Sequence, residues 1–554
     1  MDKLLTKPIF SVLLLIILSA YLFFFQLGNI ALTDPDEAFY GQTAKEMLNR
    51  GEWLTPYLYG NPQFEKPILF YLLVKVSFMI FGVTEFAARF PSAIFGLLGI
   101  IAIYLLGTLL FNNRVGLLSA VILATNVEYI VLSRACVTDM TLFVFMLFGI
   151  LFFFCGYLKK GGYFYLLSAA SFGLATLTKG PIAIILAGAV FIAYLLWIRD
   201  TKVIKNVPII EYILVFLVIT VPWYLLMYKL HGRGFIDTFF GFHNITRFLE
   251  SEHAIGSQVY YNVPVVLAGF FPWSVFLPFG FWHIIKKIRN QKSEVRNEKR
   301  HLIFILIWFL VIFIFFSISS TKLPTYVLPS FISLALVAAI FWDDFLRKDT
   351  SQTVVGISLS YYILFIVIIP GVGLALNFIN FDYPSILLES FISSLFLIFG
   401  MAFSFATFIR RKFTSAFFLI VYSVILFLYP TSKLILPKIE PYETSKEISQ
   451  KVLTLLKGDE KLGAESHYLA GLAFYTNKIP INLDRHHVLV DFLNSKNNVW
   501  CVLKEKNHIQ LYELNTEPLY MKPSYMVYKF DKKAILTNKL PPNGRYILKR
   551  DRPK

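Results

Sequence analysis

Long apolar stretches alternate with short polar turns along most of the chain. The stretches of about the length that crosses a bilayer as a helix lie at 8–27, 86–110, 115–132, 140–158, 163–178, 181–198, 208–230, 263–285, 302–320, 323–342, 353–376, 384–409 and 413–430. Because a helix rises 1.5 Å per residue, about 20 apolar residues cross the hydrocarbon core. The pattern therefore predicts an all-α polytopic membrane protein with about 13 transmembrane helices.

A shorter apolar stretch, 67–82, decides which side of the membrane each later turn faces, and it carries Lys75 near its middle. If this stretch does not cross, the clusters of Lys and Arg, such as those at 286–300 and 410–412, face the side of the N-terminus. Cytoplasmic turns are enriched in Lys and Arg, so we interpret 67–82 as an interfacial helix. This topology predicts a cytoplasmic N-terminus and a periplasmic C-terminus.

The composition excludes several other classes of protein. Of the 554 residues, 56% are hydrophobic and 16% are charged, whereas roughly a quarter of the residues of a soluble chain are charged. A soluble enzyme, a disordered chain and a disulfide-stapled secreted module are therefore excluded. Basic cytoplasmic turns explain the net charge of +17, which consequently does not predict nucleic-acid binding. The three cysteines are widely spaced and form no metal-ligand pattern.

The composition changes after residue 430. Short β-rich segments, "NVWCVLK" around Trp500 and "SYMVYKF", alternate with helical ones. We therefore predict a transmembrane domain at 1–430, which includes a periplasmic loop at 28–85, and a small periplasmic α/β domain at 431–554.

Acidic side chains gather in the loop after the first span and at the outer end of a later span. Asp36 follows Pro35. It is either the cap of the helix predicted to run to about Arg50 or a residue of the functional site. Asp139 in "SRACVTDMTLF" is likewise either a helix cap or a functional ionisable group at the membrane. The topology brings both acids to one membrane face, where two carboxylates can orient a substrate, hold a metal or act as a base.

Basic residues show a matching pattern on the same predicted face. Lys66 lies in "FEKP", Lys179 in "LTKGP", Lys322 in "STKLPTY" and Arg247 in "FHNITRF". A lone cation at the end of a span usually extends to the headgroups, but four cations beside acids at one depth indicate a site for a lipid phosphate. Tyr326 adds a hydroxyl donor there.

His243 in the loop at 231–262 has two interpretations. It is either a metal ligand together with Glu65 or a structural histidine beside aromatic residues. No Gly-rich loop that would hold a nucleotide phosphate stands out, so we expect no nucleotide cofactor.

Six motifs carry a resemblance to a known family, and they occur in the same order over about the first 330 residues: "DPDEAFYGQTAKEML", "GEWLTPYLYGNPQFEKP", "EFAARFP", "LTKGP", "FHNITRF" and "TKLPTY". With these motifs the sequence resembles the bacterial lipid A aminoarabinose transferases (ArnT), within the protein mannosyltransferase-like group of GT-C fold. The resemblance implies a multi-pass enzyme of the bacterial inner membrane that acts on the periplasmic side. It would transfer 4-amino-4-deoxy-L-arabinose or a related sugar, with inversion, from a polyprenyl phosphate carrier to lipid A or another envelope glycolipid.

The resemblance also assigns roles to residues. Its essential acids match Asp36 and Asp139, and Asp34 and Glu37 lie in the substrate loop beside Asp36. The residues that match the donor-phosphate site are Lys66, Arg247 and Tyr326, to which the cation pattern adds Lys179 and Lys322. A divalent metal of the family (Zn, Mg or Mn) would fall on Glu65 and His243.

Two other functions stay open. A protein O-mannosyltransferase would use the same type of donor but glycosylate secreted Ser or Thr residues. A lipid-linked sugar flippase or transporter predicts paired broken spans and acids near the bilayer midplane, whereas the candidate residues here lie in loops and at the ends of spans.

Overall fold

The computed structural model describes residues 8–159, 161–199, 205, 207–246, 258–290, 296–348, 351–382, 386–495, 497–504, 525–530 and 533–537. The chain divides into two compact units. The bundle unit consists of Met1–Leu27, Phe64–Leu73 and Arg89–Ile435, and the loop–sheet unit consists of Gly28–Gln63, Val74–Ala88 and Leu436–Lys554. The loop at 28–63 thus groups with the residues after Leu436, while the predicted domains 1–430 and 431–554 stay a prediction.

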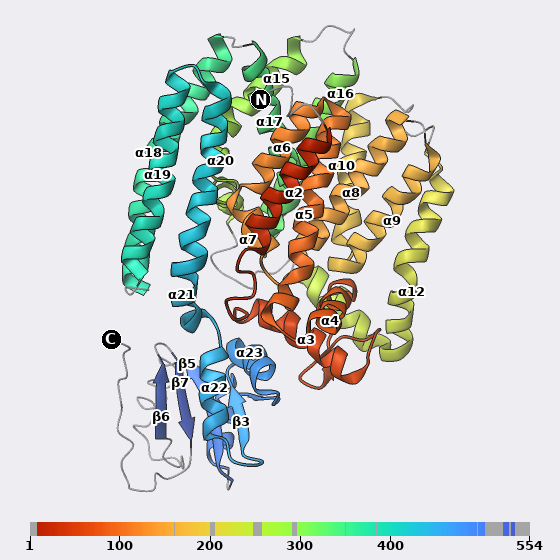
Figure 1. Ribbon diagram of the computed structural model, residues 1–554. Coiled ribbons are helices and arrows are strands. Elements are labelled where there is room, and N and C mark those ends of the chain that lie inside the picture. The colour runs from red at the N-terminus through yellow and green to blue at the C-terminus, as the bar shows by residue number, and fades with distance from the viewer. Residues whose placement is uncertain are drawn as a thin grey trace. The chain divides into compact units, whose positions relative to one another are not determined.

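The bundle unit is built almost entirely from helices (Figure 1). Its first half contains α2 (Pro8–Phe24), most of α5 (Glu85–Leu110), α6 (Asn113–Ala124), α7 (Val127–Ser133), α8 (Thr138–Lys159), α9 (Gly162–Lys179), α10 (Ile182–Ile198), α12 (Ile209–Ile236) and the π-helix η1 (Asp237–Thr246). Its second half contains η3 (Val259–Tyr261), α14 (Asn262–Gly269), η4 (Trp273–Phe276), α15 (Leu277–Asn290), α16 (Arg296–Ile318), η6 (Pro324–Ser330), α17 (Phe331–Lys348), α18 (Ser351–Asp382), α19 (Leu387–Ile409), α20 (Phe413–Pro430) and η8 (Thr431–Ile435).

The predicted class of polytopic helical membrane protein is confirmed, but the count of 13 spans is not. Among the described residues, eight helices are long and apolar enough to cross a membrane, or ten if each of two bent helix pairs is one span. Each predicted apolar stretch contains a helix, yet α2 and α10 have only 17 residues. At 1.5 Å per residue such helices are slightly shorter than the roughly 30 Å hydrocarbon core.

The two bent pairs interrupt predicted spans. α6 and α7 meet at 69°, and Val259–Gly269 meets Trp273–Asn290 at 111°. At the first bend the side chain of Asn126 accepts a hydrogen bond of 2.9 Å from the backbone N–H of Tyr129 and so caps α7. A side-chain cap of this kind satisfies a backbone donor that a continuous helix would have bonded internally, so it favours a new helix start.

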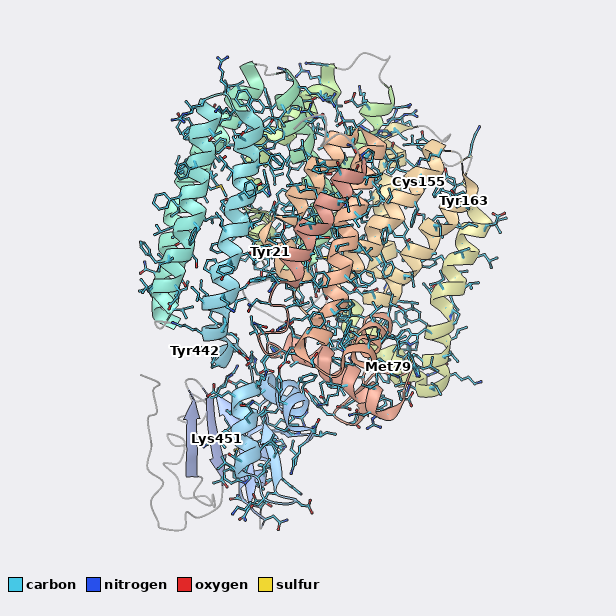
Figure 2. All side chains as sticks on the ribbon, viewed as in Figure 1. Tyr21, Met79, Cys155, Tyr163, Tyr442 and Lys451 are labelled. Carbon is cyan, nitrogen blue, oxygen red and sulfur yellow. The ribbon has the colours of Figure 1, made fainter. Side chains whose placement is uncertain are left out.

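Buried indoles hold the centre of the bundle unit. Trp273 is fully buried, donates from Nε1 to Thr125 Oγ1 at 2.9 Å, and packs with its ring centroid 4.9 Å from that of Phe417. Trp308 donates to the backbone carbonyl of Pro329 at 2.8 Å. A buried indole N–H needs an acceptor in an apolar interior, so each of these contacts fixes the direction in which a large ring packs. The labelled residues Tyr21 and Cys155 mark α2 and α8 in Figure 2.

The helix α4 (Leu69–Phe81) covers most of the stretch 67–82. Its 13 residues are fewer than a spanning helix needs, and α4 is among the short apolar helices of the chain. Lys75, near its middle, belongs to the loop–sheet unit, where Nζ donates to the backbone carbonyl of Glu52 at 2.5 Å and lies 3.7 Å from the ring centroid of Trp53. These contacts explain how a lysine fits into an apolar helix.

The loop–sheet unit joins two distant parts of the chain. Residues 28–63 contribute α3 (Asp36–Arg50), β1 (Tyr57–Leu58) and β2 (Asn61–Pro62). The later elements are α21 (Leu436–Glu443), α22 (Lys446–Leu455), β3 (Lys461–Ala464), α23 (Ser466–Thr476), β4 (Ile481–Asn482), α24 (His486–Leu493), β5 (Val499–Lys504), β6 (Tyr525–Phe530) and β7 (Lys533–Thr537). Tyr442 and Lys451 mark α21 and α22 in Figure 2.

A five-stranded sheet of order β4-β3-β5-β7-β6 forms the later part of this unit. β3 pairs in parallel with β4 and β5, while β7 pairs antiparallel with β5 and β6. The strands predicted around Trp500 and in "SYMVYKF" are β5 and β6. Trp500 and Val502 of β5 pack with Ile448 and Val452 of α22 and Leu472 of α23. The sheet therefore supports the two helices α22 and α23.

Candidate active site

A cavity of about 110 Å³ lies in the bundle unit. It brings together five of the residues that the sequence predicted for the site: Lys66, Asp139, Lys179, His243 and Tyr326. The remaining lining consists of hydroxyl side chains (Ser319, Thr321 and Thr325) and an apolar wall (Leu142, Ile182, Leu186, Phe315, Phe316 and Pro329). The cavity therefore combines cations, one acid and hydroxyl donors with an apolar surface.

Asp139 and Lys179 form an ion pair in this cavity. Asp139 lies in the first turn of α8 and Lys179 is the last residue of α9, and these two helices pack against each other. Lys179 Nζ is 2.6 Å from Asp139 Oδ1, and the side chains are only 13% and 10% exposed. An acid at a helix N-terminus and a cation at a C-terminus are each stabilised by the helix dipole. The carboxylate of Asp139 thus forms an ion pair with Lys179, in addition to its place in the first turn of α8.

The end of α9 explains where Lys179 points. Gly180 follows it with φ of 94°, a conformation that residues with a side chain rarely adopt. The chain therefore leaves the helix directly after Lys179. The ammonium lies 4.8 Å from the ring centroid of Tyr326, within reach of a cation–π interaction. Tyr326 packs in turn on Phe316, with ring centroids 5.4 Å apart.

Hydroxyl groups enter the cavity at the break between α16 and η6. Ser319 Oγ donates to the backbone carbonyl of Thr321 at 3.0 Å, which stabilises the turn. Ser319, Thr321 and Thr325 are functional candidates that the sequence reasoning missed, although two of them stand in the motif "TKLPTY". The available signal was that Pro324 lies between the two Thr residues of this motif, because proline is favoured at the first turn of a helix and so marks a break between helices.

Lys66 and His243 line the cavity from two other segments. Lys66 Nζ is 3.2 Å from Glu65 Oε1, with side-chain exposures of 14% and 27%. His243 lies in the π-helix η1, a conformation that recurs at functional sites. In the part of the chain that the structure describes, no group of three His, Cys, Asp or Glu side chains comes together for a metal. A carboxylate and an imidazole are suitable ligand types for Zn or Mn, so the metal on Glu65 and His243 stays a prediction.

The predicted phosphate ligand Lys322 is not among the described residues that line this cavity. Arg247 lies outside the described residues. Lys322 is 3% exposed in the turn between α16 and η6, and burial lowers its pKa from the ordinary lysine value. Its role at the donor phosphate stays a prediction.

The three acids of the predicted substrate loop belong to the loop–sheet unit. Asp36 is exposed and is the first residue of α3. The N-cap position is taken by Pro35, so the interpretation of Asp36 as the cap is wrong by one residue. Glu37 is buried, and its Oε2 accepts hydrogen bonds of 3.0 Å from both the N–H and the hydroxyl of Thr33. Because Asp36 and Asp139 lie in different units, their convergence on one site stays a prediction.

Asp34 is the third of these acids. It is buried, and Ser445 Oγ donates a hydrogen bond to its Oδ2. Burial raises the pKa of Asp34 to about 7, against the opposing effects of the hydrogen bond from Ser445 and the charge of Lys533. The structure thus gives Asp34 partners within its own unit, and a direct role toward a substrate stays a prediction.

Comparison with known proteins finds one matching family and several similar chains. Residues 65–226 match the family of dolichyl-phosphate-mannose-protein mannosyltransferases. An undecaprenyl phosphate-alpha-4-amino-4-deoxy-L-arabinose arabinosyl transferase of Yersinia enterocolitica is 31% identical over 346 residues, which are 60% of each chain. The match thus spans about 60% of that enzyme's length. A protein of Aquifex aeolicus is 32% identical over 59% of this chain and 73% of its own length.

Solved structures show the same fold. The structure of ArnT from Cupriavidus metallidurans bound to undecaprenyl phosphate superposes with a TM-score of 0.79 and 23% identity, over 95% of this chain and 98% of that one. An archaeal oligosaccharyltransferase, AglB from Archaeoglobus fulgidus, superposes with a TM-score of 0.53 and 13% identity over 91% of this chain.

The helical membrane bundle has the fold of the solved ArnT structure, which is the fold of the GT-C class of membrane glycosyltransferases. Within that class, the chain belongs to the ArnT and protein mannosyltransferase-like family.

Proposed function

We propose that the protein transfers a sugar from a polyprenyl phosphate carrier to lipid A or another envelope glycolipid, on the periplasmic face of the bacterial inner membrane. The observation that carries this proposal is the cavity in which Lys66, Lys179 and hydroxyl groups surround a space beside an apolar wall. A lipid phosphate needs cationic and hydrogen-bonding partners for its head and an apolar surface for its chain. The sugar is expected to be 4-amino-4-deoxy-L-arabinose or a close relative, because the Yersinia enterocolitica relative carries that name.

The cations supply electrostatic catalysis. As the bond between the anomeric carbon and the phosphate oxygen breaks, its electron pair stays on the phosphate and negative charge grows there. Lys66 and Lys179, fixed by ion pairs with Glu65 and Asp139, stabilise that charge without having to reorganise. The Tyr326 hydroxyl and the Thr321 and Thr325 hydroxyls add hydrogen bonds in the same cavity.

The acceptor oxygen forms the new bond to the anomeric carbon from the face opposite the leaving phosphate. A single displacement of this kind inverts the configuration of the sugar. If the acceptor is a hydroxyl, Asp36 takes its proton. If the acceptor is a phosphate of lipid A, it is already anionic and Asp36 only orients it.

A divalent metal on Glu65 and His243 is part of the proposal, because these residues supply one oxygen and one nitrogen ligand. When bound, such an ion would polarise a phosphate oxygen. The steps above depend on side chains of the chain itself.

The proposal is tested with the purified protein in detergent. The assay measures sugar transfer from a polyprenyl phosphate sugar to the acceptor. We expect Lys66→Ala to lower kcat/KM for the donor about 10- to 100-fold, since a hydrogen bond to a charged group contributes about 1.5–3 kcal/mol. Lys229→Ala, at an exposed position on α12, is the matched control and should retain activity. Full activity in both Lys66→Ala and Asp36→Asn would refute the proposal. Activity without a membrane gradient would exclude a pure transporter.

Protein O-mannosyl transfer is a second candidate function, favoured by the family match of residues 65–226. The two functions differ in the acceptor. Offering lipid A and a Ser/Thr-rich peptide to the same enzyme preparation separates them, because the proposed function predicts that only the lipid becomes glycosylated.

A further inference from the structure

The segment that leads into Asp36 is held by residues from the C-terminal part of the chain. Four backbone positions, 31–34, contact α21, α23 and the turn after α21. These contacts are Ala31 N–H to Glu440 Oε1 at 3.0 Å, Leu32 N–H to the Tyr475 hydroxyl at 2.8 Å, Asp34 N–H to the Glu443 carbonyl at 3.0 Å, and an antiparallel bridge between Thr33 and Thr444. Every residue of the segment is therefore fixed by a partner about 400 positions away in the sequence.

The side chain of Asp34 closes this arrangement. Ser445, which is fully buried, donates its hydroxyl to Asp34 Oδ2. Gly471 packs so tightly against the carboxyl that a Cβ added there would lie 2.3 Å from Asp34 Oδ1. The carboxyl group of Asp34 thus fills a space that is shaped by two residues of the C-terminal part.

Three further contacts connect the C-terminal part to residues outside this segment. Lys446 Nζ lies 2.8 Å from Glu85 Oε1, and the Tyr475 hydroxyl donates to the same oxygen at 3.3 Å. Lys45 of α3 donates to the backbone carbonyl of Phe474. Residues 440–475, here called the clamp, therefore hold the start of α3, its third turn and the first turn of α5.

The position of Asp36 follows from these contacts. It stands two residues after Asp34 and opens α3, and Glu37 bonds back to Thr33 within the clamped segment. Fixing 31–34 fixes the direction of the first turn of α3, and with it the backbone from which the side chain of Asp36 projects. In a transferase a misplacement of about 1 Å can reduce the rate about 100-fold.

We propose that the clamp is a positioning device for Asp36, in which Ser445 and Gly471 are positioning residues that act through Asp34. The proposal rests on the proposed function, in which Asp36 binds or deprotonates the acceptor. It gives the C-terminal part of the chain a role in the reaction.

The clamp should respond to pH because Asp34 is a buried acid. The titratable groups that face it are Glu443 of α21, Lys533 of β7 and Tyr59 of the loop after β1, together with the hydroxyl of Ser445 and the amide of Gly471. Burial raises the pKa of Asp34 to about 7, so the clamp holds a neutral carboxyl in mildly acidic medium. Above that pH a charge develops in the buried site, and Lys533 and the hydrogen bonds from Ser445 and Gly471 offset only part of the effect of burial.

The test compares Ser445→Ala and Gly471→Ala with Ser449→Ala in the full-length enzyme. Ser449 is also buried, lies one turn further along α22, and its hydroxyl has no hydrogen-bond partner among the described residues. Ser445→Ala and Gly471→Ala should lower kcat at least 10-fold and leave KM for the donor within twofold. They should also move the change in activity that the native enzyme shows near pH 7 to a different pH. Ser449→Ala should keep both the rate and the pH profile of the native enzyme.

An unchanged kcat and pH profile in Ser445→Ala and Gly471→Ala would overturn the clamp. If either variant fails to fold, Asp34→Asn replaces it: this amide has the shape of the acid but does not titrate, and should remove the change near pH 7. A pH profile identical to the native one in Asp34→Asn would also overturn the clamp. Failure of the proposed function is distinct, because Asp36→Asn would then remain fully active.

Discussion

Lys179 Nζ lies 2.6 Å from Asp139 Oδ1, at the point where α9 ends and α8 begins. The two residues are 40 positions apart, and both side chains line the cavity of the bundle unit. An ion pair with so little exposure is stable only while both partners are present, because each alone would be a buried unpaired charge. The pair therefore fixes a cation beside the space that we assign to the donor phosphate.

Replacing Lys179 by Met should be costly for both stability and activity. The variant leaves Asp139 charged without its partner, and breaking a buried pair in this way typically costs about 3–5 kcal/mol. Thermal unfolding in detergent should show a lowered midpoint, and transfer from the donor should be nearly abolished.

The double variant Asp139→Asn/Lys179→Met separates the two effects. It removes both charges, so the midpoint should recover toward the native value while activity stays low. Recovery of activity in the double variant would show that neither charge takes part in the reaction.

Tyr326→Phe should affect the reaction without affecting the packing. The ring that contacts Lys179 and Phe316 is retained, and only the hydroxyl is lost. We expect kcat/KM for the donor to fall about 5- to 10-fold, in line with the roughly 1 kcal/mol of a neutral hydrogen bond. Tyr326→Ala, which also removes the ring beneath the ammonium, should be several-fold worse. Equal activity of the Phe variant and the native enzyme would mean that the hydroxyl does not reach the phosphate.

The sequence allowed the helical class to be predicted, together with five of the side chains that line one cavity, and the reasons are local. Apolar stretches of spanning length specify helices directly, and the motifs around Lys66, Asp139, Lys179 and Tyr326 marked side chains that do meet in one cavity. The bend at Asn126 was not predicted, because a single side-chain cap decides it within a continuous apolar stretch. The contact between Asp34 and Ser445 joins residues 411 positions apart, and no periodicity along the chain encodes such a pairing.

The stability of the protein should fall as the pH rises from about 4 to about 7. The pKa of Asp34 is 3.8 in an unfolded chain and is raised to about 7 by burial, so in this interval the folded state binds more protons than the unfolded state. The free energy of unfolding then decreases with pH, by up to about 4 kcal/mol if Asp34 acts alone. Below about pH 4 both states bind this proton and the contribution no longer changes.

Asp34→Asn provides the control for this pH dependence. Its side chain does not titrate, so the unfolding midpoint measured from pH 4 to pH 8 should be flatter than that of the native protein. An unchanged slope would assign the pH dependence to other groups, such as Glu447, whose pKa is also raised by burial.

Metal removal distinguishes two roles of Glu65. If Glu65 and His243 bind a divalent ion, His243→Ala and Glu65→Gln should both lower the metal content of the purified protein, measured by elemental mass spectrometry, and dialysis against a chelator should lower activity. Glu65 also pairs with Lys66 at 3.2 Å, so a loss of activity in Glu65→Gln alone would not identify a metal. Lys66→Ala resolves this ambiguity, because it breaks the ion pair while leaving both ligands in place and should therefore keep the metal content of the native enzyme. A native preparation without bound metal that is fully active after chelation would assign Glu65 to the positioning of Lys66 only.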